Sequence, residues 1–138
     1  MEQYFGLCQN ILINMIEETY CSYEISTLLK EKGFDIGCYG RYSTRSKEFH
    51  FDATRKCENH DLFTIAAPTH QMAIKWLREK GIYITIVYGD YPSLNKVFWT
   101  PQIDSIEGFD LPDDFYENYD KYEDAIEAAL KYTLKNLI

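Results

Sequence analysis

Two helix endings of nearly the same sequence lie forty-eight residues apart in this chain. Residues 28–34 read Leu-Leu-Lys-Glu-Lys-Gly-Phe, and residues 76–82 read Trp-Leu-Arg-Glu-Lys-Gly-Ile. Cations suit the negative end of a helix, and glycine readily takes the left-handed conformation that often follows its last turn. Apolar, strand-like residues follow each ending. The pattern therefore predicts two helix-to-strand units in a small mixed fold.

Helix signals occur at three places, and each segment has a single apolar stripe. The predicted helices span residues 23–32, 70–80 and 121–136. Ser22 and Thr69 carry hydroxyls that can cap the first two of them. Residues 1–18 also have apolar side chains at helical spacing, which favours a further short helix. His70, at the start of its helix, is expected to face solvent.

Strand signals form two predicted hairpins, over residues 36–52 and 82–100. The alternating run 82–88 is the clearest strand. Residues 53–66 read as a polar connection without regular structure before Leu62. The sequence thus predicts one α+β domain over residues 1–138, ordered helix-strand-strand-helix-strand-strand-helix. Its helices should cover one face of a small, mostly antiparallel sheet.

The composition favours a self-sufficient domain, because 46% of the 138 residues are apolar and 16% are aromatic. No apolar run approaches the length of a membrane span, and no signal peptide is visible. The cytoplasm is therefore the expected compartment. In that compartment the cysteines should be buried free thiols rather than disulfides. They are Cys8, Cys21, Cys38 and Cys57.

The net charge of −8 is concentrated in one segment. Residues 104–127, here called the acidic segment, hold ten acids and one base, Lys121, so this segment carries −9 and the rest of the chain +1. Nucleic-acid backbones are bound by clustered cations. The sequence therefore predicts no nucleic-acid partner.

Three stretches together make the chain resemble a family of short proteins of unknown function from Bacteroidetes genomes and their phages and mobile elements. They are residues 22–34, residues 67–79 and residues 122–132. The resemblance spans most of the chain. It implies no activity and no catalytic residues that can be carried over.

Catalytic and metal-binding motifs are sparse. Cys57 and His60 have Cys-x-x-His spacing, but zinc sites usually need a second close pair of ligands. The sequence predicts no metal and no cofactor. A small hydrolase or transferase whose site assembles from dispersed residues is the alternative function, and His50, His60, Cys57 and Asp61 would be its first candidates.

Aromatic residues interleave with acids inside the acidic segment. Rings supply contact area and carboxylates supply orientation, so this strip is a candidate docking site for a basic protein. The candidate residues are Phe109, Asp113, Asp114, Phe115, Tyr116, Glu117 and Tyr119. The other interpretation is that the rings only seal this connection onto the core. The predicted function is a non-enzymatic protein-binding or accessory module.

Opposite charges on one small chain also favour self-association. Residues 41–56 hold five bases and two acids, a local charge of +3. This basic segment could pair with the acidic segment within one chain, or between two chains of a homodimer. The homodimer is the preferred prediction.

Overall fold

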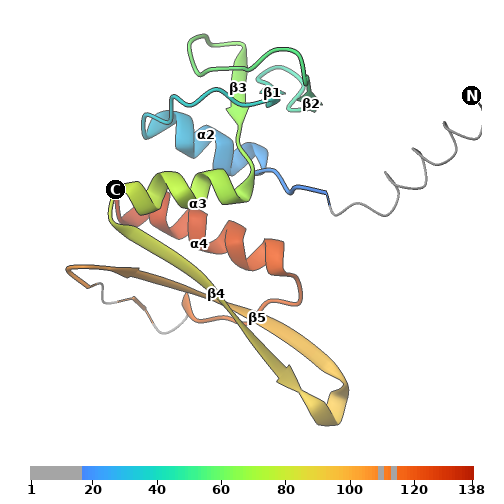
Figure 1. The fold of residues 1–138 in the computed structure, drawn as a ribbon, viewed down its shortest axis with the longest axis vertical. Coiled ribbons are helices and arrows are strands. Elements are labelled where there is room, and N and C mark those ends of the chain that lie inside the picture. Colours follow the sequence, from blue (N-terminus) through green and yellow to red (C-terminus); the bar gives the residue numbers. More distant parts are fainter. Residues whose placement is uncertain (1–16, 109–110, 113–114) are drawn as a thin grey trace, which may run out of the picture.

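The computed structural model describes residues 17–108, 111–112 and 115–138 (Figure 1). Its helices are α2 (Tyr23–Glu31), α3 (His70–Glu79) and α4 (Tyr122–Asn136). Its strands are β1 (Gly40–Ser43), β2 (Phe49–Phe51), β3 (Thr64–Ala67), β4 (Ile82–Tyr91) and β5 (Lys96–Ser105), with a short 3-10 helix, η1 (Pro92–Leu94), between the last two. The α+β class and the three helices are confirmed. The helix predicted within residues 1–18 falls almost wholly outside the described residues.

The helix ends form as their local sequence predicts. The Ser22 hydroxyl accepts a hydrogen bond from the Ile25 backbone at 3.2 Å, and the Thr69 hydroxyl accepts one from the Met72 backbone at 3.2 Å. Gly33 has a φ of +90° just after the C-cap of α2. A side chain there would be strained, so glycine ends this helix at low cost.

The strands form two antiparallel sheets rather than the single sheet that was expected. One sheet has the order β2-β1-β3, and the other pairs β4 with β5. Figure 1 shows the helices lying between the three-stranded sheet and the β4–β5 ribbon. The helices therefore do not cover one face of a common sheet; each sheet packs against helices separately.

Strand β3 begins after Leu62, at the end of the polar connection 53–66, where no strand was predicted. Its four residues pair with β1, and a side chain distant from the strand fixes their position. The Asn59 amide accepts a hydrogen bond from the Ala66 backbone at 2.8 Å and donates one to the Phe34 carbonyl at 2.9 Å. Tertiary contacts thus form a strand where local propensity is weak.

The ribbon is longer than the predicted hairpin 82–100, because β5 continues past Pro101 to Ser105. Pro101 lies opposite Ile86 in the register of the pair. Each strand of a two-stranded ribbon has only one neighbour, so a residue without a backbone N–H is tolerated on its outer edge. Pro101 and Ile103 are buried, which anchors this end of the ribbon against the core.

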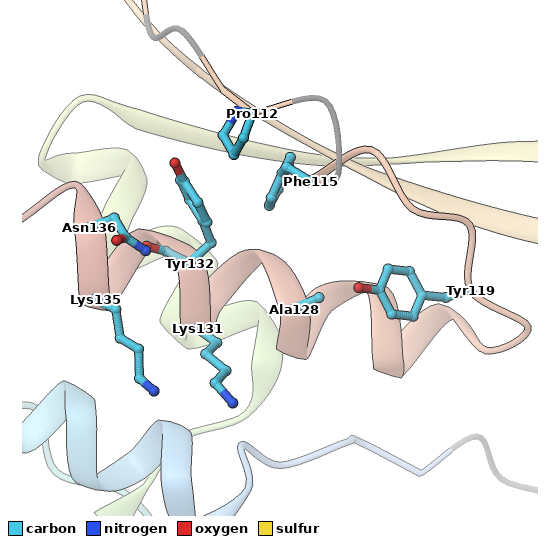
Figure 2. A pocket seen from close by; sticks show the side chains of 8 residues that line it. All are labelled: Pro112, Phe115, Tyr119, Ala128, Lys131, Tyr132, Lys135 and Asn136. Carbon is cyan, nitrogen blue, oxygen red and sulfur yellow. The ribbon is translucent and has the colours of Figure 1, made fainter.

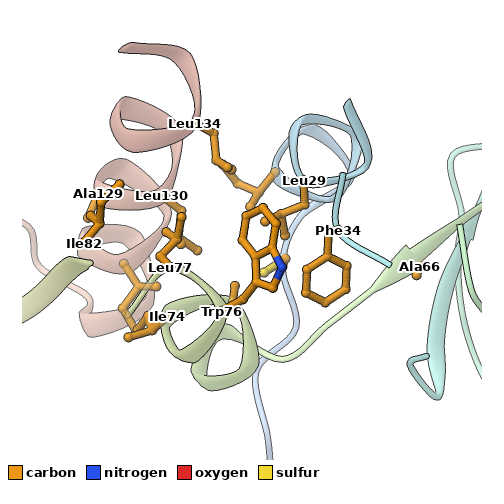
Figure 3. Packing of buried hydrophobic residues seen from close by; sticks show 14 of the residues in the cluster. Leu29, Phe34, Ala66, Ile74, Trp76, Leu77, Ile82, Ala129, Leu130 and Leu134 are labelled. Carbon is orange, nitrogen blue, oxygen red and sulfur yellow. The ribbon is translucent and has the colours of Figure 1, made fainter. Parts of the chain in front are cut away.

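The hydrophobic core centres on α4, which contacts α2, α3 and both strands of the ribbon. Leu130 and Leu134 of α4 are fully buried and pack in the same cluster as Leu77 of α3 (Figure 3). The rings of Phe34 and Trp76 meet edge to face with centroids 5.5 Å apart. Helix α4 therefore joins α2, α3 and the ribbon in one core, and the three-stranded sheet contacts α2 through β3.

Cys21, Cys38 and Cys57 are free and buried, which confirms the prediction for these three residues. Cys8 lies outside the described residues. None of the helices in the described ranges combines the length and the apolar character needed to cross a bilayer.

Candidate functional site

The aromatic residues of the acidic segment are partly anchored on the core. Phe115 is 8% exposed, and its ring centroid lies 4.9 Å from that of Tyr132 on α4. The backbones of Trp99 and Tyr119 exchange two hydrogen bonds of 2.8 Å, so the segment runs back beside β5. This anchoring agrees with the interpretation that rings seal the connection onto the core.

Some of the candidate residues of the acidic segment are not packed against the core. Tyr116 is 49% exposed, Glu117 is exposed, and Tyr119 is half-buried. These three follow Phe115 along one stretch of backbone. Phe109, Asp113 and Asp114 lie outside the described residues.

An open groove of about 350 Å³ lies between this stretch and the outer face of α4 (Figure 2). Phe115, Tyr119 and Tyr132 supply its aromatic lining, and Ala128 is the small residue of α4 between them. The volume is in the range of sites that accept a small ligand or one large side chain. The groove is therefore the concave feature to which the candidate residues belong.

Lys131 and Lys135 also line this groove, but their ammonium groups are turned towards α2, away from Tyr132 (Figure 2). Their amines lie 3.0 Å and 3.5 Å from the same carboxylate oxygen of Glu24. The hydrogen bond from Lys131 leads the causes that lower the pKa of Glu24, followed by the charges of both lysines. The described lining of the groove thus combines aromatic rings with two half-exposed lysines that pair with Glu24.

The acids of this segment are poorly neutralised within the chain. In the described residues, Asp120 has a cationic partner, Lys96, at 3.9 Å, and both side chains are largely exposed. Glu127 is satisfied in the interior by His70 and Ser22. Burial, followed by the charge of Glu117, raises the pKa of Tyr119. Glu117 and Asp120, exposed on either side of Tyr119 in the sequence, therefore place negative charge next to the groove, although none of its described lining residues is an acid.

A second cleft, of about 540 Å³, lies at the other sheet, between the loop 55–61 and strands β1 and β3. It brings together three residues of the alternative catalytic prediction, Cys57, His60 and Asp61. His50 is exposed on β2 and does not line this cleft.

The hydrogen bonds in the second cleft do not form a catalytic chain. The His60 ring pairs with Glu58, whereas the Cys57 thiol faces the Thr64 hydroxyl at 3.7 Å. One carboxylate oxygen of Asp61 accepts bonds from the backbones of Phe63 and Thr64 and from the Thr64 hydroxyl. Asp61 thus orders the turn into β3. Within the described ranges, no three His, Cys, Asp or Glu side chains are grouped as metal ligands.

The expectation that His70 faces solvent is wrong, because this residue is 3% exposed. Its Nε2 lies 2.7 Å from Glu127 Oε1, and its Nδ1 lies 2.9 Å from the Thr19 hydroxyl. The other Glu127 oxygen accepts the Ser22 hydroxyl at 2.8 Å. Burial alone would raise the pKa of Glu127, but the hydrogen bonds from His70 and Ser22 outweigh it and lower that pKa.

This buried network joins the N-termini of α2 and α3 to the middle of α4. Sequence reasoning missed it because Glu127 reads as one more member of the acidic segment. The residues that it connects are up to 105 positions apart. A structural role is its simplest interpretation, since its polar atoms satisfy one another.

No protein-family model, curated protein or solved structure matches this chain. The resemblance to the Bacteroidetes family therefore stays a prediction, and the functional argument depends on the chain's own geometry.

Proposed function

We propose that the chain is a non-enzymatic protein-binding module that docks a basic partner protein at the groove on α4. The observation that carries this proposal is an open groove lined by three aromatic rings, next to the exposed acids Glu117 and Asp120 that flank Tyr119 in the sequence. Aromatic pockets with a polar rim are where binding energy concentrates in protein interfaces. A partner that presents an apolar side chain flanked by Lys or Arg fits this arrangement.

The anchoring that seals this connection onto the core also supports a binding role. Phe115 and Tyr119 are held by Tyr132 and Trp99, so the groove is formed before a partner arrives. A preformed site loses less conformational freedom on association. Tyr116 stays exposed beside it and can add contact area.

Affinity capture from lysate of the source cells, quantified by mass spectrometry, tests this function. Two variants change the site in different ways. Glu117→Lys with Asp120→Lys reverses the charge next to the groove, and Ala128→Trp fills the groove. Asp35→Lys with Glu79→Lys is the matched control, because it makes the same change in net charge at exposed positions elsewhere. Far-ultraviolet circular dichroism checks that all variants fold.

We expect at least one protein to be enriched with wild type and with the control, and about tenfold or more depleted with both site variants. Recovery of the same proteins with wild type and with both site variants would refute docking at this groove.

The runner-up function is a small hydrolase or transferase, and the cleft that contains Cys57, His60 and Asp61 favours it. The hydrogen bonds of His60 and Asp61 argue against it, because neither residue is bonded to Cys57. Hydrolysis of generic ester and phosphoester substrates, lost on Cys57→Ala or His60→Ala, would place this function above protein binding.

Self-association is a further part of the proposal, because the chain carries its own basic surface. In the described residues, no ion pair joins residues 41–56 to the acidic segment; Arg41 instead lies 3.8 Å from Asp52. The basic β1–β2 hairpin and strand β5, at whose end the acidic segment begins, lie on opposite sides of the helices (Figure 1). An antiparallel homodimer would bring both pairs of opposite charges together.

We therefore expect sedimentation velocity to show a dimer in equilibrium with monomer at about 0.05 M salt, shifting to monomer at about 0.5 M salt. Exposed ion pairs are weak and strongly screened, which explains the expected salt dependence. The double variant of Glu117 and Asp120 should weaken the dimer at low salt. A monomer at every concentration and both salts would contradict this prediction.

A further inference from the structure

Cys38 and Cys57 lie directly opposite each other on neighbouring antiparallel backbone segments. The two residues exchange both backbone hydrogen bonds, at 2.9 Å and 2.7 Å. In such a pair the Cα atoms are about 5.5 Å apart and the side chains project from the same face. That separation falls within the range that a disulfide spans, about 4.4–6.8 Å.

Both thiols are reduced and nearly covered, with Cys38 2% exposed and Cys57 6% exposed. The Cys38 sulfur lies 3.3 Å from the Ile36 carbonyl, and the Cys57 sulfur lies 3.6 Å from the Glu58 carbonyl. Thiol hydrogen bonds are weak, so these two contacts offer little resistance to rotation of either side chain.

Only Cys57 of this pair lines the second cleft. Arg41, Arg55 and Lys56 line the same cleft, together with the acids Glu58 and Asp61. Three cations face two acids in this lining; the Asp61 carboxylate is engaged by the backbone, and Arg41 lies 3.8 Å from Asp52 outside the lining. The cations that line the cleft would attract a small oxidant with negative charge, and a peptide disulfide with free carboxylates is such an oxidant.

We infer that Cys38 and Cys57 form a dithiol–disulfide pair that exchanges with anionic low-molecular-weight disulfides, such as glutathione disulfide, through this cleft. Cys57 attacks one sulfur of the small disulfide, forms a mixed disulfide and releases one glutathione thiol. Cys38 then attacks the Cys57 sulfur and releases the second glutathione thiol. The protein loses two protons and two electrons, and these reduce one glutathione disulfide to two thiols.

The order of attack follows from the positions of the two thiols. Burial, followed by the nearby Cys57, raises the pKa of Cys38 to about 11. Cys38 is therefore protonated at neutral pH and cannot reach the cleft directly, so it acts second. The exchange is independent of protein binding at the groove on α4, which lies near the other sheet.

Disulfide mapping by mass spectrometry tests the inference, after incubation of the full reduced chain with glutathione disulfide at about pH 8 and alkylation of the remaining thiols. We expect a peptide that joins Cys38 to Cys57, with Cys21 still alkylated. Cys38→Ser should accumulate a glutathione adduct at Cys57, whereas Cys57→Ser should leave Cys38 free. Cys21→Ser, the matched control, should behave as wild type. Alkylation of both Cys38 and Cys57 in the wild type, or a bond from either residue to Cys21, would overturn the inference.

The role of the cleft in attracting an anionic disulfide is tested separately, by comparing the reaction rates with a charged and an uncharged disulfide. Arg55→Glu with Lys56→Glu should slow the reaction with glutathione disulfide about tenfold and leave the reaction with uncharged hydroxyethyl disulfide unchanged. Equal slowing of both reactions, or of neither, would remove the cleft from the exchange. Thermal melting of each reduced variant verifies that the fold is kept.

Discussion

Glu127→Ala is expected to lower the free energy of unfolding by about 3 kcal/mol, measured by urea denaturation at neutral pH. The carboxylate accepts hydrogen bonds from the Ser22 backbone and hydroxyl, and it pairs with the buried His70 ring. Its removal leaves three polar groups without their acceptor in the interior, and unpaired buried groups are costly. The loss should be large because it affects the starts of both α2 and α3.

Glu79→Ala is the matched control, since Glu79 is an exposed acid at the end of a helix. Its effect should stay within about 0.5 kcal/mol. Glu127→Gln should lower the free energy of unfolding by an amount between those of Glu127→Ala and Glu79→Ala, because an amide can still accept one hydrogen bond. A Glu127→Ala protein as stable as the control would show that the network is not a stabilising element.

The same network predicts a dependence on pH. The lowered pKa of Glu127 in the folded chain means that its stabilisation is fully present above the ordinary pKa of a glutamate, about 4.3. It is lost as the pH falls through the lower, folded-state pKa. The difference in the free energy of unfolding between wild type and Glu127→Gln should therefore be constant near neutral pH. It should become smaller at acidic pH.

Leu130→Ala is expected to cost about 2–5 kcal/mol of folding free energy, measured in the same way. Leu130 is fully buried on α4, in the cluster that links the helices to the ribbon. Truncation removes apolar contacts and leaves a cavity that the neighbouring helices cannot readily fill. Helices α2 and α3 and the β4–β5 ribbon all pack on α4, so the loss should lower the stability of the whole domain.

Leu94→Ala provides the comparison for the same change in side chain, because Leu94 is 69% exposed in η1. Its effect should be within about 0.5 kcal/mol. If the two leucine variants were equally stable, the core would not be centred on α4.

The helices could be predicted from the sequence because their signals are local. A capping hydroxyl such as that of Ser22, an apolar stripe and a terminal glycine such as Gly33 act within a few residues of each other. The ribbon was predictable for a similar reason, since its alternating pattern reflects one buried face. The extension of the ribbon beyond Pro101 was missed because the pairing was expected to end at Thr100, with Pro101 marking that end at an edge or bulge.

The features that were missed depend on contacts between distant residues. Strand β3 is positioned by the Asn59 amide, and His70 is buried by its bond to Glu127. The groove itself exists because the Tyr119 backbone pairs with that of Trp99. The candidate residues of the acidic segment could be selected by composition, but their division into buried anchors and exposed contacts required the fold.

Photo-crosslinking in the source cells tests the central claim, docking at the groove on α4, most directly. A photoreactive phenylalanine derivative would replace exposed Tyr116 beside the groove or, as the control, exposed Phe51 in the three-stranded sheet. We predict a crosslinked adduct from position 116 that disappears when Ala128→Trp or the double charge reversal of Glu117 and Asp120 is added, and no such adduct from position 51. The absence of an adduct at position 116, or one that persists in both site variants, would contradict the account.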